Sequence, residues 1–140
     1  MPRESISAQF VIKNALLASK LAKRVGNRLS AHGISLTEYL LMHYLDNSPR
    51  KAVPRIELAE HIGMSASGVT RLIAPMEKRK IIEKEANSRD ARQSLVKLSE
   101  TGQRLYREAS TSFEHISNEL VGSLSRSQQE KIVTLYAKVI

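Results

Sequence analysis

Two short amphipathic segments joined at a glycine constrain the fold of this chain more than any other feature. The first covers residues 54–62, and the second runs for about 16 residues after Ser65. Gly63 suits a left-handed turn between them, and the Ser65 hydroxyl suits the N-cap of the second. Apolar residues recur at helical spacing on one side of each segment, so the pattern predicts a helix-turn-helix. These apolar residues are Leu58, Ala59 and Ile62, followed by Val69, Leu72, Ile73 and Met76.

The opposite side of the second helix carries residue types that suit a DNA groove. Near its N-terminus these are Ser67, Gly68, Thr70 and Arg71. Small residues allow close approach, hydroxyl groups bond to phosphates or base edges, and arginine pairs with guanine. The second helix of a helix-turn-helix enters the major groove. Because two helices joined at a glycine also occur in many all-α proteins, this pattern alone leaves DNA binding and a plain helical fold equally open.

A polar hairpin directly after the second helix favours DNA binding. Residues 81–85 and 93–98 read as strands, and residues 86–92 between them are too polar for a core. A basic hairpin in this place has the layout of a wing, whose arginine can enter the narrow minor groove. Asp90 would then orient the guanidinium of Arg92 through charge-assisted bonds. The alternative is a charged surface hairpin with no partner.

Long helical segments flank this central block. Residues 7–30 form the first, and Thr37 is expected to cap a second that is apolar nearly all round and runs to about residue 46. Ser99 and Ser127 are expected to cap two C-terminal helices. Each of the first and last two helices buries only one face, so these helices need each other or a second chain. The apolar seams contain Phe10, Leu17, Leu21 and Val25 in the first helix and Leu105, Ala109, Phe113, Ile116 and Leu120 in the long C-terminal helix.

The charge distribution points to a polyanionic partner of the central block. The net charge is +8, and residues 50–98 contain 11 Lys and Arg against 6 Asp and Glu. No apolar run is long enough to span a bilayer, and the N-terminus lacks the apolar core of a signal peptide, which predicts a cytoplasmic protein without membrane contact. The chain has no cysteine and therefore no thiol chemistry.

No catalytic arrangement of residues is found, which argues against an enzyme and against a metal or cofactor. The four histidines are scattered and show no ligand spacing. His43 lies on the apolar second helix and has two readings, a core histidine or a polar anchor in an effector pocket. Tyr39 on the same face would join it in the second reading.

These residues together resemble the MarR family of bacterial regulators. An Asp-x-Arg wing followed by Leu-Ser-x-x-Gly is the most specific part of the resemblance. The matching residues are Leu58, Ala59, Gly63, Ser65, Val69, Thr70, Met76, Glu77, Ile81, Ile82, Asp90, Ala91, Arg92, Leu98, Ser99 and Gly102.

The resemblance implies a mainly α fold with a small β-hairpin wing, that is, a winged helix-turn-helix with long dimerisation helices at both ends. Residues 1–140 would then be one domain, with residues 1–47 and 99–140 in the dimer interface and residues 48–98 in the DNA-binding lobe. It also implies a small anionic or aromatic effector bound between these parts. It implies major-groove contacts by Ser65, Ser67, Thr70 and Arg71, with Arg92 in the minor groove. The residue types themselves add Gly68, Arg89 and Asp90 to the candidate DNA-binding set.

The chain departs from the family pattern at three places. Lys80 stands where relatives commonly have glycine, at the end of the second helix. Ala91 stands where a basic residue is common, with Arg89 nearby to supply the charge. Pro75 lies inside the second helix and is expected to bend it.

The expected function is therefore sequence-specific transcriptional regulation, as a repressor or an activator, by a homodimer on double-stranded DNA. One alternative is an architectural protein that binds nucleic acid without sequence preference. Another is an enzyme built on a winged-helix scaffold, since fold does not determine function.

Overall fold

Helices dominate the computed structural model, which describes residues 3–140. Residues 1 and 2 of the expected dimerisation segment 1–47 lie outside this range. A small β-hairpin interrupts the helices, which confirms the expected fold class. The elements are α1 (Ile6–Leu29), the 3-10 turn η1 (Ser30–His32), α2 (Leu36–Asn47), β1 (Ala52–Pro54), α3 (Arg55–Ile62), α4 (Ala66–Lys78), β2 (Ile82–Ala86), β3 (Ser94–Leu98), α5 (Glu100–Leu120) and α6 (Arg126–Tyr136).

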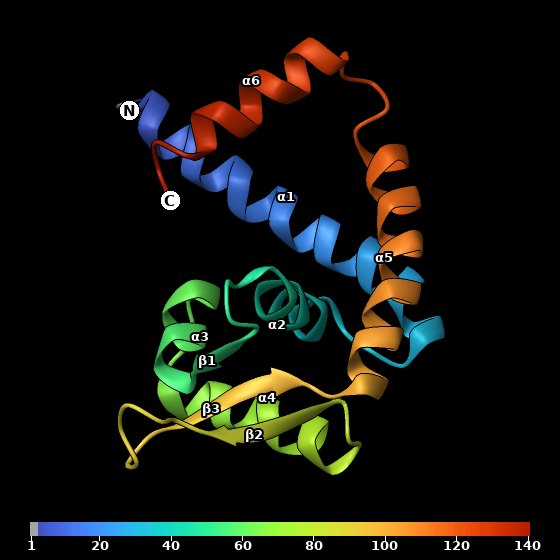
Figure 1. The fold of residues 1–140 in the computed structure, drawn as a ribbon. Helices are drawn as coiled ribbons and strands as arrows, with labels where there is room; N and C mark the ends of the chain where they lie inside the picture. Colours follow the sequence, from blue (N-terminus) through green and yellow to red (C-terminus); the bar gives the residue numbers. More distant parts are fainter. Residues whose placement is uncertain (1–2) are drawn as a thin grey trace.

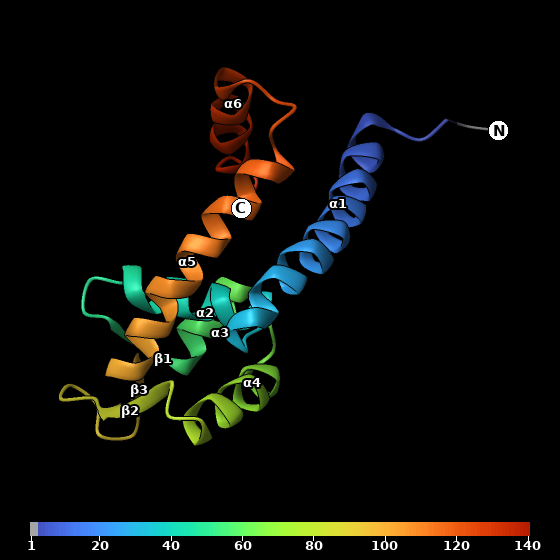
Figure 2. The ribbon, with the colours of Figure 1, turned by 90° about the vertical axis from the view of Figure 1, so that its right-hand side faces the viewer.

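Different elements form the two ends of the molecule. Helix α4 and the β2–β3 hairpin lie at one end, and α6 with the N-terminal half of α1 lies at the other (Figures 1 and 2). Helix α5 starts beside the hairpin and leads toward α6 as one continuous helix. Within residues 3–140, no helix is long and apolar enough to cross a membrane.

The sheet has three antiparallel strands in the order β1-β3-β2. Val53 lies opposite Val96, and Ile82 lies opposite Leu98. These four side chains are buried, whereas most of β2 after Ile82 is exposed. The base of the hairpin therefore belongs to the core, and its far end extends into solvent.

One continuous core joins the helices of the central block to the sheet and to α5. Its largest fully buried side chains come from α1, α2, α3, α4 and the sheet, and burial of this apolar surface is the main stabilising term. They are Leu29, Leu41, Met42, Leu45, Leu58, Val69, Ile73, Met76, Ile82 and Val96.

Two predicted helix caps are wrong by two residues each. Ser35, not Thr37, caps α2 in a capping box with Glu38. Ser125, not Ser127, caps α6 in a capping box with Gln128. In both places two Ser or Thr residues are separated by one residue, and the first of them makes the reciprocal pair of hydrogen bonds.

Smaller differences concern the start of α3 and the length of α4. Pro54 ends β1 and precedes α3, whereas the sequence suggests it as the first helical residue. Helix α4 has 13 residues and ends at Lys78, three residues after Pro75. The expected caps Ser65 and Ser99 are both confirmed.

Candidate nucleic-acid interface

The orientation of α4 follows from its turn and its buried side. Gly63 has a φ of +73°, the left-handed conformation that favours glycine. The Ser65 hydroxyl accepts a hydrogen bond from the Gly68 N–H at 3.1 Å, which caps the helix. Val69, Ile73 and Met76 are buried, so the opposite side of α4 faces solvent.

The exposed side of α4 contains part of the predicted contact set and extends beyond it. Ser67 is exposed in its first turn and Arg71 near its middle, and Thr70 is exposed at its edge toward α3. Lys78 lies on the same exposed side, seven residues after Arg71, and was missed by the sequence reasoning. Continuing the helical spacing past Pro75 would have found it.

Two predicted contact residues of α4 have structural roles in the turn. Ser65 uses its hydroxyl for the cap, and that oxygen lies 3.3 Å from the Ser67 hydroxyl. Gly68 is half-buried, and a β-carbon there would lie 3.2 Å from Cε of Met64. Gly68 therefore lets the helix pack closely against the turn residue Met64.

The backbone at the end of α4 shows how Lys80 fits where relatives commonly have glycine. Lys80 itself adopts a φ of +60°. Its N–H donates to the Glu77 carbonyl at 2.9 Å, and the Ile81 N–H donates to the Met76 carbonyl at 2.9 Å. These two bonds form a Schellman motif, so the chain keeps the expected turn with a lysine in the position that favours glycine.

The wing tip is ordered by hydrogen bonds from aspartate and asparagine side chains to the backbone. Asn87 accepts from the Arg89 N–H at 3.0 Å, and Asp90 accepts from the Arg92 N–H at 2.9 Å. The expectation that Asp90 would orient the Arg92 guanidinium is wrong for this structure. Ion pairs among residues 3–140 include none between these two side chains, because the carboxylate closes an Asx turn on the backbone.

The basic residues of the hairpin stem form ion pairs, whereas those of the wing tip form none within the described range. Lys84 lies 3.8 Å from Glu77, and Lys97 lies within 4 Å of two glutamates of β2. On α4 and the wing tip, four exposed cations form no ion pair with any residue of 3–140. They are Arg71 and Lys78 on α4 and Arg89 and Arg92 at the wing tip.

Arg55, at the start of α3, reaches across to α4. Its Nη2 lies 3.2 Å from a carboxylate oxygen of Glu77, and its Nη1 donates to the Thr70 hydroxyl at 3.4 Å. The sequence reasoning missed this residue. No spacing rule within one helix could have found it, because the contact depends on how α3 packs on α4.

The two residues suggested for an effector have different environments. Tyr39 is buried, stacks on Phe113 with ring centroids 4.4 Å apart, and donates to the Ser110 hydroxyl at 3.1 Å. Burial raises the pKa of Tyr39 to about 12, so the phenol is neutral at ordinary pH. His43 is exposed, so its reading as a core histidine is wrong. An effector at these residues stays a prediction.

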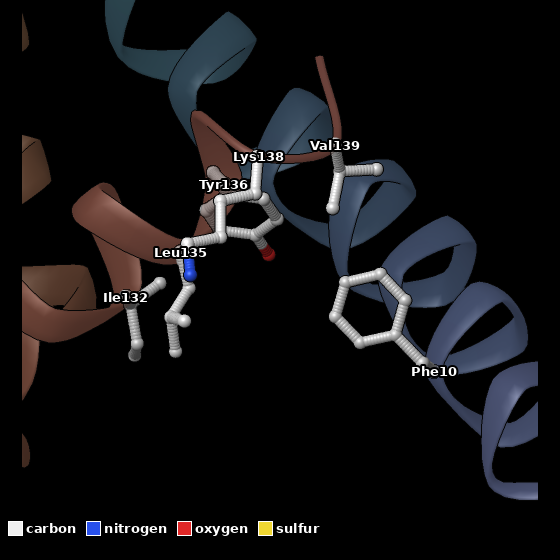
Figure 3. A pocket seen from close by; sticks show the side chains of 6 residues that line it. All are labelled: Phe10, Ile132, Leu135, Tyr136, Lys138 and Val139. Carbon is white, nitrogen blue, oxygen red and sulfur yellow. The ribbon is translucent and has the colours of Figure 1, made fainter.

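An apolar surface lies at the opposite end of the molecule. Phe10 of α1 faces the side chains of α6 across a cavity of about 510 Å³ (Figure 3). Its ring centroid lies 6.4 Å from that of Tyr136, whose hydroxyl donates to Asn14. We call the exposed residues here the α1–α6 apolar surface: Ile6, Phe10, Leu17, Ile132, Leu135 and Val139.

The element order and the exposed basic side of α4 beside the hairpin define a winged helix-turn-helix protein. Residues 32–93 match the model of the MarR family. Over residues 32–93 the chain is thus similar to the MarR family, which confirms the resemblance indicated by the motif residues.

Known proteins are similar to this chain in sequence or in fold. The transcriptional repressor MprA of Escherichia coli K12 is 25% identical over 124 residues, which cover 89% of this chain and 70% of that protein. A MarR family regulator from Rhodococcus sp. RHA1 superposes with a TM-score of 0.87 at 14% identity, covering 98% and 96% of the two chains. Sco3205 of Streptomyces coelicolor, a MarR family regulator solved with DNA, gives 0.83 at 20% identity, covering 99% and 89%. These structural matches show a shared fold.

Proposed function

We propose that this chain is a transcriptional regulator that binds double-stranded DNA as a homodimer, on a pseudo-palindromic operator. The observation that carries this proposal is the set of four exposed cations without ion pairs on α4 and the wing tip, at one end of the molecule. Cations that no carboxylate neutralises are available to phosphates and base edges. The similarity to a repressor and to a regulator solved with DNA supports the same function.

The proposed roles follow from where each side chain lies. Arg71 and Ser67 enter the major groove from the exposed side of α4, and Thr70 does so from its edge. Ser65 and Gly68 hold the start of that helix. Arg89 and Arg92 reach the minor groove, and Asp90 keeps the wing turn in shape without touching DNA. Lys78 contacts a phosphate.

The proposed dimer forms through the α1–α6 apolar surface. These side chains are too apolar to stay in water over so large an area, and a second copy would cover them on both chains by two-fold symmetry. Residues 1–47 and 99–140 would supply this interface, and residues 48–98 the DNA-binding lobe.

We also propose how this chain would regulate transcription. We propose repression, in line with the relative MprA, and release by a small aromatic or anionic effector near Tyr39 and His43. Such a regulator works where the chromosome lies, so we propose the cytoplasm as its location.

The proposal is tested by selecting bound duplexes from a random DNA library and measuring affinity for the enriched site and for unselected DNA at fixed salt. Enrichment of an inverted repeat is the expected result. Replacing Arg71 with alanine should weaken binding to the enriched site by about 1–3 kcal/mol per half-site.

Lys131, an exposed cation of α6 at the other end, provides the matched control. Lys131→Ala removes the same charge and should leave affinity nearly unchanged. Equal affinity for enriched and unselected DNA, with a steep salt dependence, would instead indicate an architectural binder.

A further inference from the structure

Arg55 fixes one side of the recognition helix from a neighbouring helix. One guanidinium contacts Thr70 and Glu77 of α4, which lie two helical turns apart on the same side. The guanidinium is planar, so holding one amino group against Glu77 also sets the position of the other. That second amino group is the one that meets the Thr70 hydroxyl.

The ion pair that holds Arg55 is partly shielded from water. The side chains of Arg55 and Glu77 are 31% and 28% exposed, so salt screens them less than a fully exposed pair. Glu77 also lies 3.8 Å from Lys84 of β2. One carboxylate therefore joins α3, α4 and the wing strand, and Arg55 has a fixed anchor beside Thr70.

These contacts leave the Thr70 hydroxyl with one free hydrogen-bonding position. A hydroxyl has one proton and two acceptor lone pairs. Thr70 donates its proton to the Ala66 carbonyl at 3.1 Å and accepts from Arg55 with one lone pair. The remaining lone pair can only accept a hydrogen bond.

An acceptor in the major groove distinguishes between bases. Adenine N6 and cytosine N4 present amino donors there, whereas guanine O6 and N7, thymine O4 and the phosphate oxygens are all acceptors. A threonine restricted in this way can pair only with an amino group.

We infer that Arg55 is a positioning residue that makes Thr70 a reader of adenine or cytosine at one position of each half-site. This inference rests on the proposed function. It assigns Thr70 to base reading and excludes it as a phosphate contact. Arg55 acts through Thr70 and need not touch DNA itself.

The test uses the full chain and the site enriched from the random library. Duplexes with each of the four base pairs at every position are compared for the wild type and for Thr70→Val, which keeps the shape of the side chain without its hydroxyl. At one position per half-site the wild type should prefer A or C by about tenfold, and Thr70→Val should lose that preference. Thr70→Ser should retain it.

Arg55→Lys separates positioning from simple charge. Lysine keeps the positive charge and can pair with Glu77, but its single ammonium group cannot also hold Thr70 in the same geometry. The expected result is loss of preference at the Thr70 position, with affinity for unselected DNA unchanged. Adding Thr70→Val to Arg55→Lys should change the preference no further.

The outcomes separate this inference from the proposed function. A wild-type chain that enriches no sequence overturns both. Enrichment of a site whose preferences are unaffected by Arg55→Lys overturns the inference alone. Uniform weakening by Arg55→Met on all sequences, restored by Arg55→Lys, would show a phosphate contact and overturn it as well. Urea unfolding of each variant confirms that the compared chains are folded.

Discussion

At the scale of single residues, Lys80 shows how a chain can meet a backbone requirement with an unfavourable residue. The left-handed conformation brings the β-carbon of an L-residue close to a carbonyl oxygen and costs roughly 1–2 kcal/mol. Lys80 adopts it because the Schellman bonds at the end of α4 require it. The side chain is exposed and makes no ion pair within residues 3–140, so little offsets this cost locally.

Replacing Lys80 with glycine should therefore stabilise the fold. The expected gain is about 1 kcal/mol in the free energy of unfolding, measured by urea denaturation. Lys80→Ala is the matched control, because it removes the charge but keeps the β-carbon. A gain from alanine equal to that from glycine would show that charge, and not backbone conformation, is the source.

At the scale of elements, the wing depends on side-chain to backbone hydrogen bonds more than on charge. Asp90 accepts from the Arg92 N–H. Residues 88–94 of the tip are all exposed, so no buried side chain holds the tip in place. The carboxylate is thus a structural part of the turn, and its negative charge beside DNA phosphates is unfavourable.

This geometry predicts opposite effects of two substitutions at Asp90. Asp90→Asn keeps an oxygen acceptor and removes the charge, so affinity for the enriched site should be unchanged or higher. Asp90→Ala loses the turn and should weaken binding by about 1 kcal/mol per half-site. Fluorescence anisotropy at fixed salt measures both, and equal loss in the two variants would favour a role for the charge.

The joint between α5 and the end of α4 is a second element-scale feature. The Ser99 hydroxyl donates toward the Lys80 and Ile81 carbonyls, at 2.6 and 3.0 Å, and caps α5 by accepting from the Gly102 N–H. A β-carbon at Gly102 would overlap the Ile81 carbonyl oxygen. Only glycine allows the two backbones to meet this closely.

Gly102→Ala should destabilise the fold by roughly 3 kcal/mol, because backbone must shift to admit the methyl group. Gly26→Ala in α1 is the matched control, since its β-carbon would meet nothing within 4 Å. That change should be neutral or stabilising through helix propensity. Thermal unfolding followed by circular dichroism compares them, and similar losses in both variants would contradict the overlap.

The order of the elements could be predicted from the sequence, while their ends and cross-contacts could not. Periodicity finds α4 because its apolar side faces a core. Ser125 and Ser127 both begin a Ser-x-x-Gln or Ser-x-x-Glu pattern, so local sequence cannot choose between them. Asp90 is recognisable as a turn residue, but whether it meets a guanidinium or an N–H depends on the loop path. Arg55 requires the packing of two helices.

At the scale of the whole molecule, two features lie at opposite ends (Figure 1). Helix α4 and the wing, which carry the four unpaired cations, are at one end, and the α1–α6 apolar surface is at the other. In the proposed dimer, such separation would let one end hold the two chains together while the other ends contact successive turns of DNA. The two recognition helices of the proposed dimer should then lie about 34 Å apart.

Placing a charge in the apolar surface should separate the chains and weaken DNA binding together. Phe10→Glu and Leu135→Glu are expected to sediment as monomers at micromolar concentration, with affinity for the enriched site reduced at least tenfold. Ile56→Glu, at an exposed apolar position of α3, should leave the sedimenting mass that of the dimer. A wild-type chain that sediments as a monomer would contradict the proposed dimer.

Helix α5 has a mechanical consequence, since it is an uninterrupted rod of 21 residues, about 31 Å long. Its N-terminal end is fastened to the wing stem and the recognition helix through Ser99 and Gly102. A tilt of about 5° around its far end would therefore move that fastening by about 3 Å, close to the rise of one base pair. A slight rotation between the two subunits of the proposed dimer would thus displace each recognition helix by about one base pair along the DNA.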